Sequence, residues 1–250
     1  MQRKISQWLL SLTIVATFLI TGCNTTSVSD TDVSTPTPSS QTQLSANYSD
    51  LPRLNGKATV VMTINSSPIT IEIDGMNAPL TAGNFVDLVE KGVYDGLAFH
   101  RVVREPQPFV VQGGDPQSKD INFPESRLGT GGFIDPKTGR ERYIPLEIKP
   151  QEATEPVYSK TFESARIQQQ PILSHTRGAV AMARSQPPDS ASSQFYFALT
   201  DLPFLNGNYA VFGYVTQGMK EVVDKIDAGD RIESAKVVEG LENLTIFKGS

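Results

Sequence analysis

Cysteine, histidine and positive charge are scarce in this chain, and each scarcity excludes a class of protein. The 250 residues include one cysteine and two histidines, so they cannot by themselves build an all-His/Cys metal site, and no disulfide can form within the chain. Lys and Arg number 22 against 27 Asp and Glu, which gives a net charge of -5. Because binding to nucleic-acid phosphates depends on basic residues, we do not expect nucleic acid as a partner.

The amino terminus has an apolar run that is too short to span a membrane. The run at residues 8–20 falls short of the roughly 20 apolar residues that a transmembrane helix needs. It leads into Ile20-Thr21-Gly22-Cys23, and the whole resembles a bacterial lipoprotein signal. The resemblance implies that residues 1–22 are a signal peptide and that acylated Cys23 anchors the protein to a bacterial membrane, facing the periplasm or an equivalent extracytoplasmic space. A spanning helix and a leader cut away with its free thiol remain alternatives.

The rest of the chain divides into a polar segment and a folded domain. Residues 23–52 are rich in Ser, Thr, Asp, Gln and Pro, so they cannot bury enough apolar surface to fold and are expected to form a disordered tether. Residues 53–250 are expected to form the domain. Within it, residues 133–174 make a long central connection, and connections of this length are usually functional or partly disordered. Alternating apolar residues at 144–148 indicate an edge strand there.

Most predicted elements of the domain are short strands. Apolar residues alternate at 58–64 and 69–73, with a turn between them, which predicts a two-stranded hairpin. Pro79 and a candidate N-cap, Thr81, begin a predicted helix that ends at Gly92, and a second helix is predicted over 219–226. Further strands are expected at residues 99–103, 109–112, 179–182, 194–199, 210–215, 235–238 and 244–247. Many short strands with glycine-rich turns and two helices indicate an all-β barrel or sandwich.

Three stretches, taken in order, are the most specific feature of the sequence. The first joins Phe99-His100-Arg101-Val102-Val103 to Phe109-Val110-Val111-Gln112-Gly113-Gly114-Asp115-Pro116. Gly178 to Ala183 leads to Ser193-Gln194-Phe195-Tyr196-Phe197, and residues 204–213 follow. Together these segments resemble the cyclophilin family of peptidyl-prolyl cis-trans isomerases over about residues 58–247. The resemblance implies an eight-stranded antiparallel barrel capped by two α-helices.

A prolyl isomerase needs neither a nucleophile nor a cofactor. Rotation about a peptide bond faces a barrier of about 18–20 kcal/mol, and no bond has to be broken. A site that stabilises the twisted amide is sufficient, and a permanently protonated arginine aimed at that amide can provide it. By resemblance, Arg101 is the catalytic arginine, and Gln112 holds the substrate backbone and steadies Arg101. His100 is expected to have a structural role.

The resemblance also implies an apolar slot for the proline ring and a neighbouring peptide groove. Phe204 stands where a tryptophan helps to bind cyclosporin in other members, so weak sensitivity to that drug is expected. Val110 and Arg184 also differ from the residues common at their positions. Tyr196 stands where phenylalanine is common in the family and Tyr209 where many eukaryotic members have histidine, and the added hydroxyl groups could change rate or sequence preference. The residues expected to bind substrate are Phe109, Val110, Ala183, Arg184, Gln194, Tyr196, Phe204, Leu205 and Tyr209.

Three functional hypotheses follow. The first is an exported, lipid-anchored, monomeric isomerase that acts on proline-containing polypeptide clients and assists their folding. The second is a module that binds such partners in the same groove while catalysing poorly. Arg101, Phe109 and Gln112 together favour the enzyme, because a simple binder needs no charge facing the twisted amide. A hydrolase is disfavoured because the sequence has no recognisable nucleophile turn.

Overall fold

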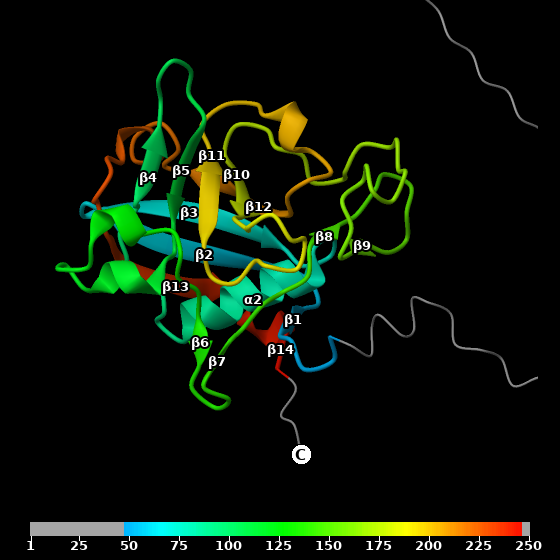
Figure 1. Cartoon of the computed structure of the whole chain (residues 1–250), viewed down its shortest axis with the longest axis horizontal. Coiled ribbons are helices and arrows are strands. Elements are labelled where there is room, and N and C mark those ends of the chain that lie inside the picture. The colour runs from blue at the N-terminus through cyan, green and yellow to red at the C-terminus, as the bar shows by residue number, and fades with distance from the viewer. Residues whose placement is uncertain (1–47, 247–250) are drawn as a thin grey trace, which may run out of the picture. The chain divides into compact units, whose positions relative to one another are not determined.

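The computed structural model describes residues 48–246 (Figure 1). Its only α-helix in this range is α2, Pro79–Glu90, and the other helical segments are short 3-10 turns. The predicted signal peptide, Cys23 and nearly all of the predicted tether lie outside the described residues. The strands are β1 Arg53–Leu54, β2 Lys57–Ile64, β3 Ser67–Asp74, β4 Arg101–Val103, β5 Val110–Gly113, β6 Ile134–Asp135, β7 Arg140–Glu141, β8 Glu147–Ile148, β9 Val157–Tyr158, β10 Ala179–Met182, β11 Phe195–Ala198, β12 Val211–Gln217, β13 Ile232–Glu239 and β14 Leu244–Thr245.

The main sheet has eight strands and is antiparallel throughout. Its strand order is β13-β2-β3-β12-β10-β11-β5-β4, and it curls into a half-barrel (Figure 1). The two edges meet through the segment before β4: the Phe99 N–H donates to the Asp230 carbonyl at 2.8 Å, and the Ile232 N–H donates to the Leu97 carbonyl at 2.9 Å. The prediction of an eight-stranded antiparallel sheet is therefore confirmed.

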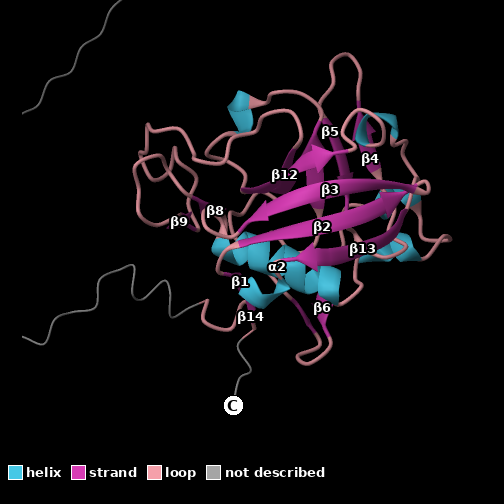
Figure 2. Cartoon of the chain, turned by 180° about the vertical axis from the view of Figure 1, so that it is seen from behind, coloured by secondary structure: helices cyan, strands magenta, loops and turns pink. Residues whose placement is uncertain are grey.

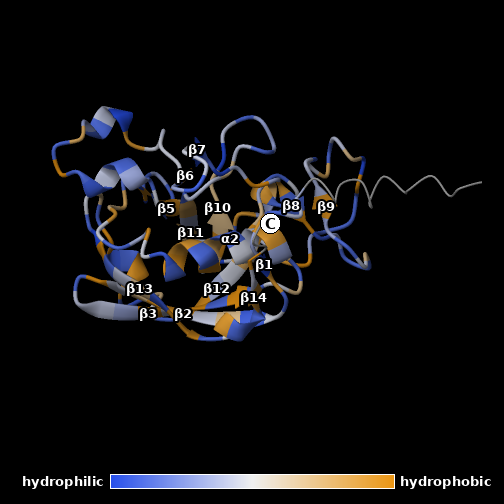
Figure 3. Cartoon of the chain, turned by 90° about the horizontal axis from the view of Figure 1, so that it is seen from below, coloured by the Kyte–Doolittle hydropathy of each residue, from blue (hydrophilic) through white to orange (hydrophobic). Residues whose placement is uncertain are grey.

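Strict alternation along the first hairpin places one face of the sheet in the core. Even-numbered residues of β2, from Ala58 to Ile64, are buried, and so are Ile69, Ile71 and Ile73 of β3. Figure 2 shows β3, β2 and β13 side by side with α2 beyond them. Figure 3 shows hydrophobic (orange) and hydrophilic (blue) residues along α2. Phe85 of α2 packs against Phe195 and Phe212 at 5.4 and 4.9 Å between ring centroids, so the helix covers the aromatic centre of the barrel.

The helix α2 is confirmed, but its predicted cap is wrong. Ala78 is the N-cap residue and makes no side-chain cap bond, whereas Thr81 lies inside the first turn. The free N–H groups of Leu80 and Thr81 donate instead to the two carboxylate oxygens of Glu147, at 3.1 and 2.7 Å. A carboxylate at this end satisfies two unpaired donors and interacts favourably with the helix dipole. Burial raises the pKa of Glu147, and these two hydrogen bonds oppose that shift.

The second predicted helix is not an α-helix. Residues 219–226 form turns and a three-residue 3-10 helix, Val223–Lys225. Val223 and Ile226 are fully buried, so these apolar residues pack in the core although the segment is not an α-helix. The backbone N–H groups of Val222, Asp224 and Lys225 donate to carbonyls four, five and three residues earlier, so no regular α-helix forms. The Arg104 guanidinium donates to the carbonyls of Asp224 and Ile226 at the end of this segment, at 2.9 and 2.7 Å. The barrel therefore has one capping α-helix rather than two.

The central connection packs on the barrel through several buried contacts. It contains the hairpin β6–β7 and the short pair β8–β9, and the apolar residues at 144–148 are buried. The Arg142 guanidinium donates to the buried Asp87 carboxylate of α2 at 2.6 Å. The predicted edge strand is present only as β8, with one bridge from Ile144 to Ala191. Among residues 48–246, no helix is long and apolar enough to cross a membrane.

Candidate active site

Arg101 and Gln112 are direct partners across two neighbouring strands. Arg101 begins β4, and the antiparallel register with β5 places it opposite Gln112. Directly opposite residues of an antiparallel pair point to the same face of the sheet. The Arg101 Nη1 donates to Gln112 Oε1 at 3.3 Å, and the Arg101 side chain is exposed. The register thus gives a solvent-accessible guanidinium whose direction is set by its neighbour.

The guanidinium of Arg101 stands at the rim of an apolar pocket with a volume of about 250 Å³. A pocket with apolar walls and a few fixed polar groups is the usual form of a small-ligand site. Nine of the eleven catalytic and substrate-binding residues predicted from sequence line it together: Arg101, Phe109, Val110, Gln112, Ala183, Arg184, Tyr196, Leu205 and Tyr209.

Phe109 forms the wall next to the arginine. The Arg101 Cζ lies 5.5 Å from the centroid of its ring, within the range of a cation–π contact. Phe204 stacks on Phe109, with 6.1 Å between ring centroids and 16° between ring planes. Phe204 is 66 % exposed and does not line the pocket, although it was predicted to bind substrate. Its contact with the site is the stacking on Phe109.

The hydroxyl of Tyr196 is hydrogen-bonded to a group that does not line the pocket. Tyr196 is buried, and its hydroxyl lies 2.9 Å from Nε2 of His175. Its ring meets that of Tyr209 edge to face, with centroids 6.2 Å apart. Burial raises the pKa of Tyr196, so the hydroxyl stays protonated. Tyr196 therefore contributes an aromatic ring to the pocket, as the phenylalanine common at this position in the family would.

Arg184 is tied to the backbone. Its guanidinium donates to the carbonyls of Ser185, Gln186 and Asn208, at 2.8 to 3.1 Å, and lies 4.7 Å from the Tyr209 ring centroid. Because the Arg184 guanidinium is hydrogen-bonded to these carbonyls, its orientation at the edge of the pocket is fixed. Of the two described arginines that line the pocket, Arg101 is the one whose guanidinium is not bonded to backbone carbonyls; its partner is the Gln112 side chain.

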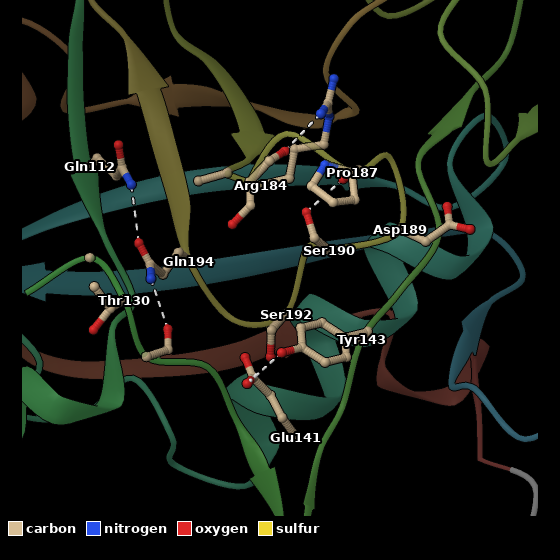
Figure 4. Close-up of a pocket in the computed structure, with 14 residues that line it drawn as sticks. Gln112, Thr130, Glu141, Tyr143, Arg184, Pro187, Asp189, Ser190, Ser192 and Gln194 are labelled. Atoms are coloured by element: carbon tan, nitrogen blue, oxygen red, sulfur yellow. Dashed lines mark hydrogen bonds between the residues drawn. The ribbon is translucent and has the colours of Figure 1, made fainter.

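A second, larger pocket of about 580 Å³ adjoins the first and shares Gln112, Ala183 and Arg184 with it. Gln194, the remaining predicted residue, lines this pocket. Figure 4 shows the amide chain along its wall: Gln112 Nε2 donates to Gln194 Oε1 at 3.1 Å, and Gln194 Nε2 donates to the Gly131 carbonyl at 2.7 Å. The orientation of Arg101 is thus coupled through two amides to the glycine loop at residues 129–132.

Asp115 organises that glycine loop, although sequence reasoning gave it no role in the site. Its buried carboxylate accepts N–H bonds from Gly129 at 2.6 Å and from Gly131 at 3.2 Å. A Cβ at Gly131 would collide with the Asp115 carboxylate, so the close approach requires glycine there. The signal was the Gly-Gly-Asp-Pro turn itself, which places a carboxylate directly after β5.

The central connection contributes two more residues that sequence reasoning missed. Glu141 and Tyr143 line the second pocket (Figure 4), and the Tyr143 hydroxyl donates to Glu141 Oε2 at 2.8 Å. That bond raises the pKa of Tyr143. Asp189 lines the same pocket from a different loop. The segment lies outside the motifs that resemble the family, so the only sequence signal for a role in the pocket was its acidic and aromatic residues.

His100 lies beside Arg101 with its ring half-buried, and its two ring nitrogens have no hydrogen-bond partner within residues 48–246. Burial lowers its pKa, and Arg101 lowers it further, while Asp115 opposes the shift. A neutral ring that only packs is consistent with the structural role predicted for it.

The fold and the site together define a β-barrel protein with two adjoining pockets, one of them an aromatic slot with an exposed arginine at its rim. A family model described as "Cyclophilin type peptidyl-prolyl cis-trans isomerase/CLD" matches residues 59–246. The chain belongs to this family.

Similar proteins support the assignment. The chain is 42% identical over 207 residues to the "Putative thylakoid lumen peptidyl-prolyl cis-trans isomerase" of Synechocystis sp., covering 79% of this chain and 51% of that protein. It is 39% identical over 215 residues to a chloroplastic peptidyl-prolyl cis-trans isomerase of Arabidopsis thaliana, covering 79% of this chain and 46% of the other. The chain thus spans about half the length of these curated relatives.

Solved structures agree on the fold. A cyclophilin of Cryptosporidium parvum superposes with a TM-score of 0.52 at 22% identity, covering 73% of this chain and 98% of the other. A cyclophilin of Hirschia baltica gives 0.50 at 19% identity and covers 81% of each chain. At this level of identity the similarity confirms the cyclophilin fold.

Proposed function

We propose that the chain is a peptidyl-prolyl cis-trans isomerase that rotates X-Pro bonds in polypeptides. One observation carries the proposal: the Arg101 guanidinium, oriented by Gln112, stands at the rim of a pocket of about 250 Å³ walled by Phe109, Tyr196 and Tyr209. The names of the relatives support the same activity.

The site would act by binding the transition state more tightly than the ground state. With the proline ring in the aromatic pocket, rotation of the preceding carbonyl breaks amide conjugation and leaves a basic lone pair on the prolyl nitrogen. Arg101 donates toward this twisted amide and cannot lose its own proton. Gln112 limits the freedom of the guanidinium, so that little reorganisation is needed during rotation.

Arg101→Ala tests the mechanism. We expect kcat/KM to fall by about 10²–10³, the usual effect of removing one preorganised donor, with folding intact because the side chain is exposed. Exchange NMR on an Ala-Pro peptide, with the full chain at catalytic concentration, measures the rate. Arg140→Ala, at an exposed arginine of strand β7 away from both pockets, is the matched control. Unchanged turnover in the Arg101 variant would exclude the mechanism.

The same experiment separates the enzyme from a peptide-binding module. A module that only binds would broaden or shift the peptide resonances without raising the cis-trans exchange rate. We propose the enzyme because Arg101, Phe109 and Gln112 line one pocket and Arg101 is hydrogen-bonded to Gln112.

We further propose that the protein works outside the cytoplasm as a lipid-anchored monomer and assists the folding of exported clients. In this proposal residues 1–22 are a signal peptide, residues 23–52 are the tether and residues 53–250 are the isomerase domain. The lipoprotein-like pattern ending at Cys23 and the thylakoid lumen name of the Synechocystis relative support this location.

Cys23→Ser tests the anchor. We expect metabolic labelling with a fatty acid to mark the original chain and not the variant, and the variant to leave the membrane fraction. Ser27→Ala, four residues away in the polar segment, should label like the original chain. Labelling that persists in the serine variant would refute the anchor while leaving the isomerase proposal untouched.

A further inference from the structure

A histidine lies buried behind the floor of the proline pocket and has no part in the mechanism above. His175 is 2 % exposed and does not line either pocket at the site. It nevertheless contacts two elements that shape the proline pocket. Its Nε2 lies 2.9 Å from the hydroxyl of Tyr196, and its Nδ1 lies 3.0 Å from Oδ1 of Asn206, the residue after the pocket residue Leu205.

The hydrogen bonds around Asn206 fix the tautomer of His175. The backbone N–H of His175 also donates to Asn206 Oδ1, at 2.9 Å. A backbone N–H can only donate, so the atom facing it must be the amide oxygen, which can only accept. The nearby Nδ1 must therefore carry the proton, and Nε2 is left as an acceptor.

The direction of the Tyr196 bond follows from this tautomer. Because Nε2 of His175 is an acceptor, the Tyr196 hydroxyl must donate to it. The two rings are also nearly parallel, with centroids 6.1 Å apart and 16° between their planes. Burial lowers the pKa of His175 to about 4, which agrees with a neutral ring between two uncharged partners.

We propose that His175 is a positioning residue for the proline pocket, in which one neutral imidazole joins the Tyr196 ring of the floor to the Asn206 side chain of the loop that carries Leu205. The inference rests on the proposed function of the pocket. Through this pair of bonds His175 keeps the Tyr196 hydroxyl engaged and sets the distance between two of the pocket walls. A tyrosine can therefore replace phenylalanine at the floor without exposing a polar group to the proline ring.

The tautomer gives a direct test that does not depend on turnover. The chain has two histidines, so His100→Gln leaves one imidazole to observe. Long-range proton–nitrogen NMR on the full chain labelled with ¹⁵N-histidine should show the Nδ1–H tautomer for His175 at neutral pH. Asn206→Leu, which removes the acceptor of the Nδ1–H group, should release this preference. An Nε2–H tautomer, or a ring that averages between tautomers in the original chain, would overturn the proposal.

Steady-state kinetics test the positioning role. His175→Leu leaves the Tyr196 hydroxyl unsatisfied, and we expect KM for an Ala-Pro peptide to rise about three- to tenfold with kcat changed less than twofold. The double variant His175→Leu/Tyr196→Phe removes both partners and should recover most of the lost affinity. Tyr214→Phe, which removes a nearby hydroxyl bonded to the Ser174 carbonyl at 3.0 Å, should leave KM unchanged.

These outcomes separate the inference from the proposed function. If the original chain shows no turnover, the isomerase proposal fails, and peptide titration by NMR gives the affinity in place of KM. If turnover is present but His175→Leu changes neither KM nor affinity, or if the double variant recovers stability without recovering affinity, His175 only supports the fold and the inference is wrong.

Discussion

The carboxylate of Glu147 caps the helix at Thr81, 66 residues earlier in the chain, with 2.7 Å between its Oε2 and the Thr81 nitrogen. Both residues are buried. The central connection is therefore attached to the barrel at the N-terminus of α2. Arg142 forms an ion pair with Asp87 of the same helix. The central connection, which contributes Glu141 and Tyr143 to the second pocket, is therefore attached to α2 at two points.

Replacing Glu147 should destabilise the domain. Glu147→Gln keeps one acceptor oxygen but turns an amide N–H₂ toward a backbone donor, and we expect a loss of about 1–3 kcal/mol in the free energy of unfolding. Urea denaturation followed by circular dichroism measures this. Glu155→Gln, at an exposed position of the same connection, should change the value by less than about 0.5 kcal/mol. Equal stabilities for the two variants would contradict the capping role.

Short-range alternation predicted the longer strands of the main sheet, and the family resemblance predicted the residues of the first pocket. Alternation at 58–64 gives the buried face of β2, and the two-residue period of β4 and β5 places Arg101 and Gln112 on one face. The antiparallel registers of β4, β5 and β11 then fix which residues of the motifs lie opposite one another. This is why nine of the eleven site residues predicted from the family resemblance meet at one pocket.

The errors arise where a distant residue decides the local structure. Thr81 has the sequence signature of an N-cap, but Glu147 satisfies the donors that a cap would serve. Residues 219–226 have helical spacing but form turns whose last carbonyls, those of Asp224 and Ile226, accept from Arg104, 120 and 122 residues earlier in the chain. Neither partner can be identified from a local window. The same limit applies to His175, whose partner Tyr196 lies 21 residues away on another element.

Phe109→Ala should weaken substrate binding and also lower stability. The ring is half-buried and forms a pocket wall between Arg101 and Phe204. We expect KM for an Ala-Pro peptide to rise about tenfold and stability to fall by about 1–2 kcal/mol, less than for a fully buried phenylalanine. Phe204→Ala, which removes an exposed ring outside the pocket, is the comparison and should raise KM less than threefold. A larger effect from Phe204 would mean that the wall is assigned to the wrong ring.

The second pocket should favour positively charged peptide flanks. Glu141 and Asp189 line it, and neither forms an ion pair within the described part of the chain, whereas the Arg184 cation is occupied by carbonyls. For partly exposed charges we expect a modest preference, about two- to fivefold in kcat/KM, for Ala-Pro peptides flanked by lysine over those flanked by glutamate.

The charge preference has two internal checks. Glu141→Gln should bring the ratio of lysine to glutamate peptides closer to one, and Glu163→Gln, at an exposed site away from the pocket, should not. The ratio should also fall as salt is added from 0.05 to about 0.5 M, because salt screens exposed charges. If Glu141→Gln leaves the ratio of lysine to glutamate peptides unchanged, the flanking residue of the peptide does not bind in the second pocket.

Acid should destabilise the domain through its buried histidine before most carboxylates titrate. The pKa of His175 is lowered by burial from 6.5 to about 4, so between those values the unfolded chain binds a proton that the folded chain does not. Stability therefore falls as pH decreases from about 6.5 to 4, by up to about 3 kcal/mol from this residue. The pKa of His100 is also lowered and adds to the effect with the same sign.

Comparing variants isolates the contribution of His175. The stability of the original chain and of His175→Gln should be measured by urea denaturation at pH 7, 6 and 5. The difference in the free energy of unfolding between the two chains should shrink with each step toward acid, because the variant has no imidazole to protonate on unfolding. Adding His100→Gln to both chains removes the second histidine from the comparison. A difference that stays constant from pH 7 to 5 would mean that His175 is protonated equally in the folded and unfolded chains, and the neutral imidazole between Asn206 and Tyr196 would then be wrong.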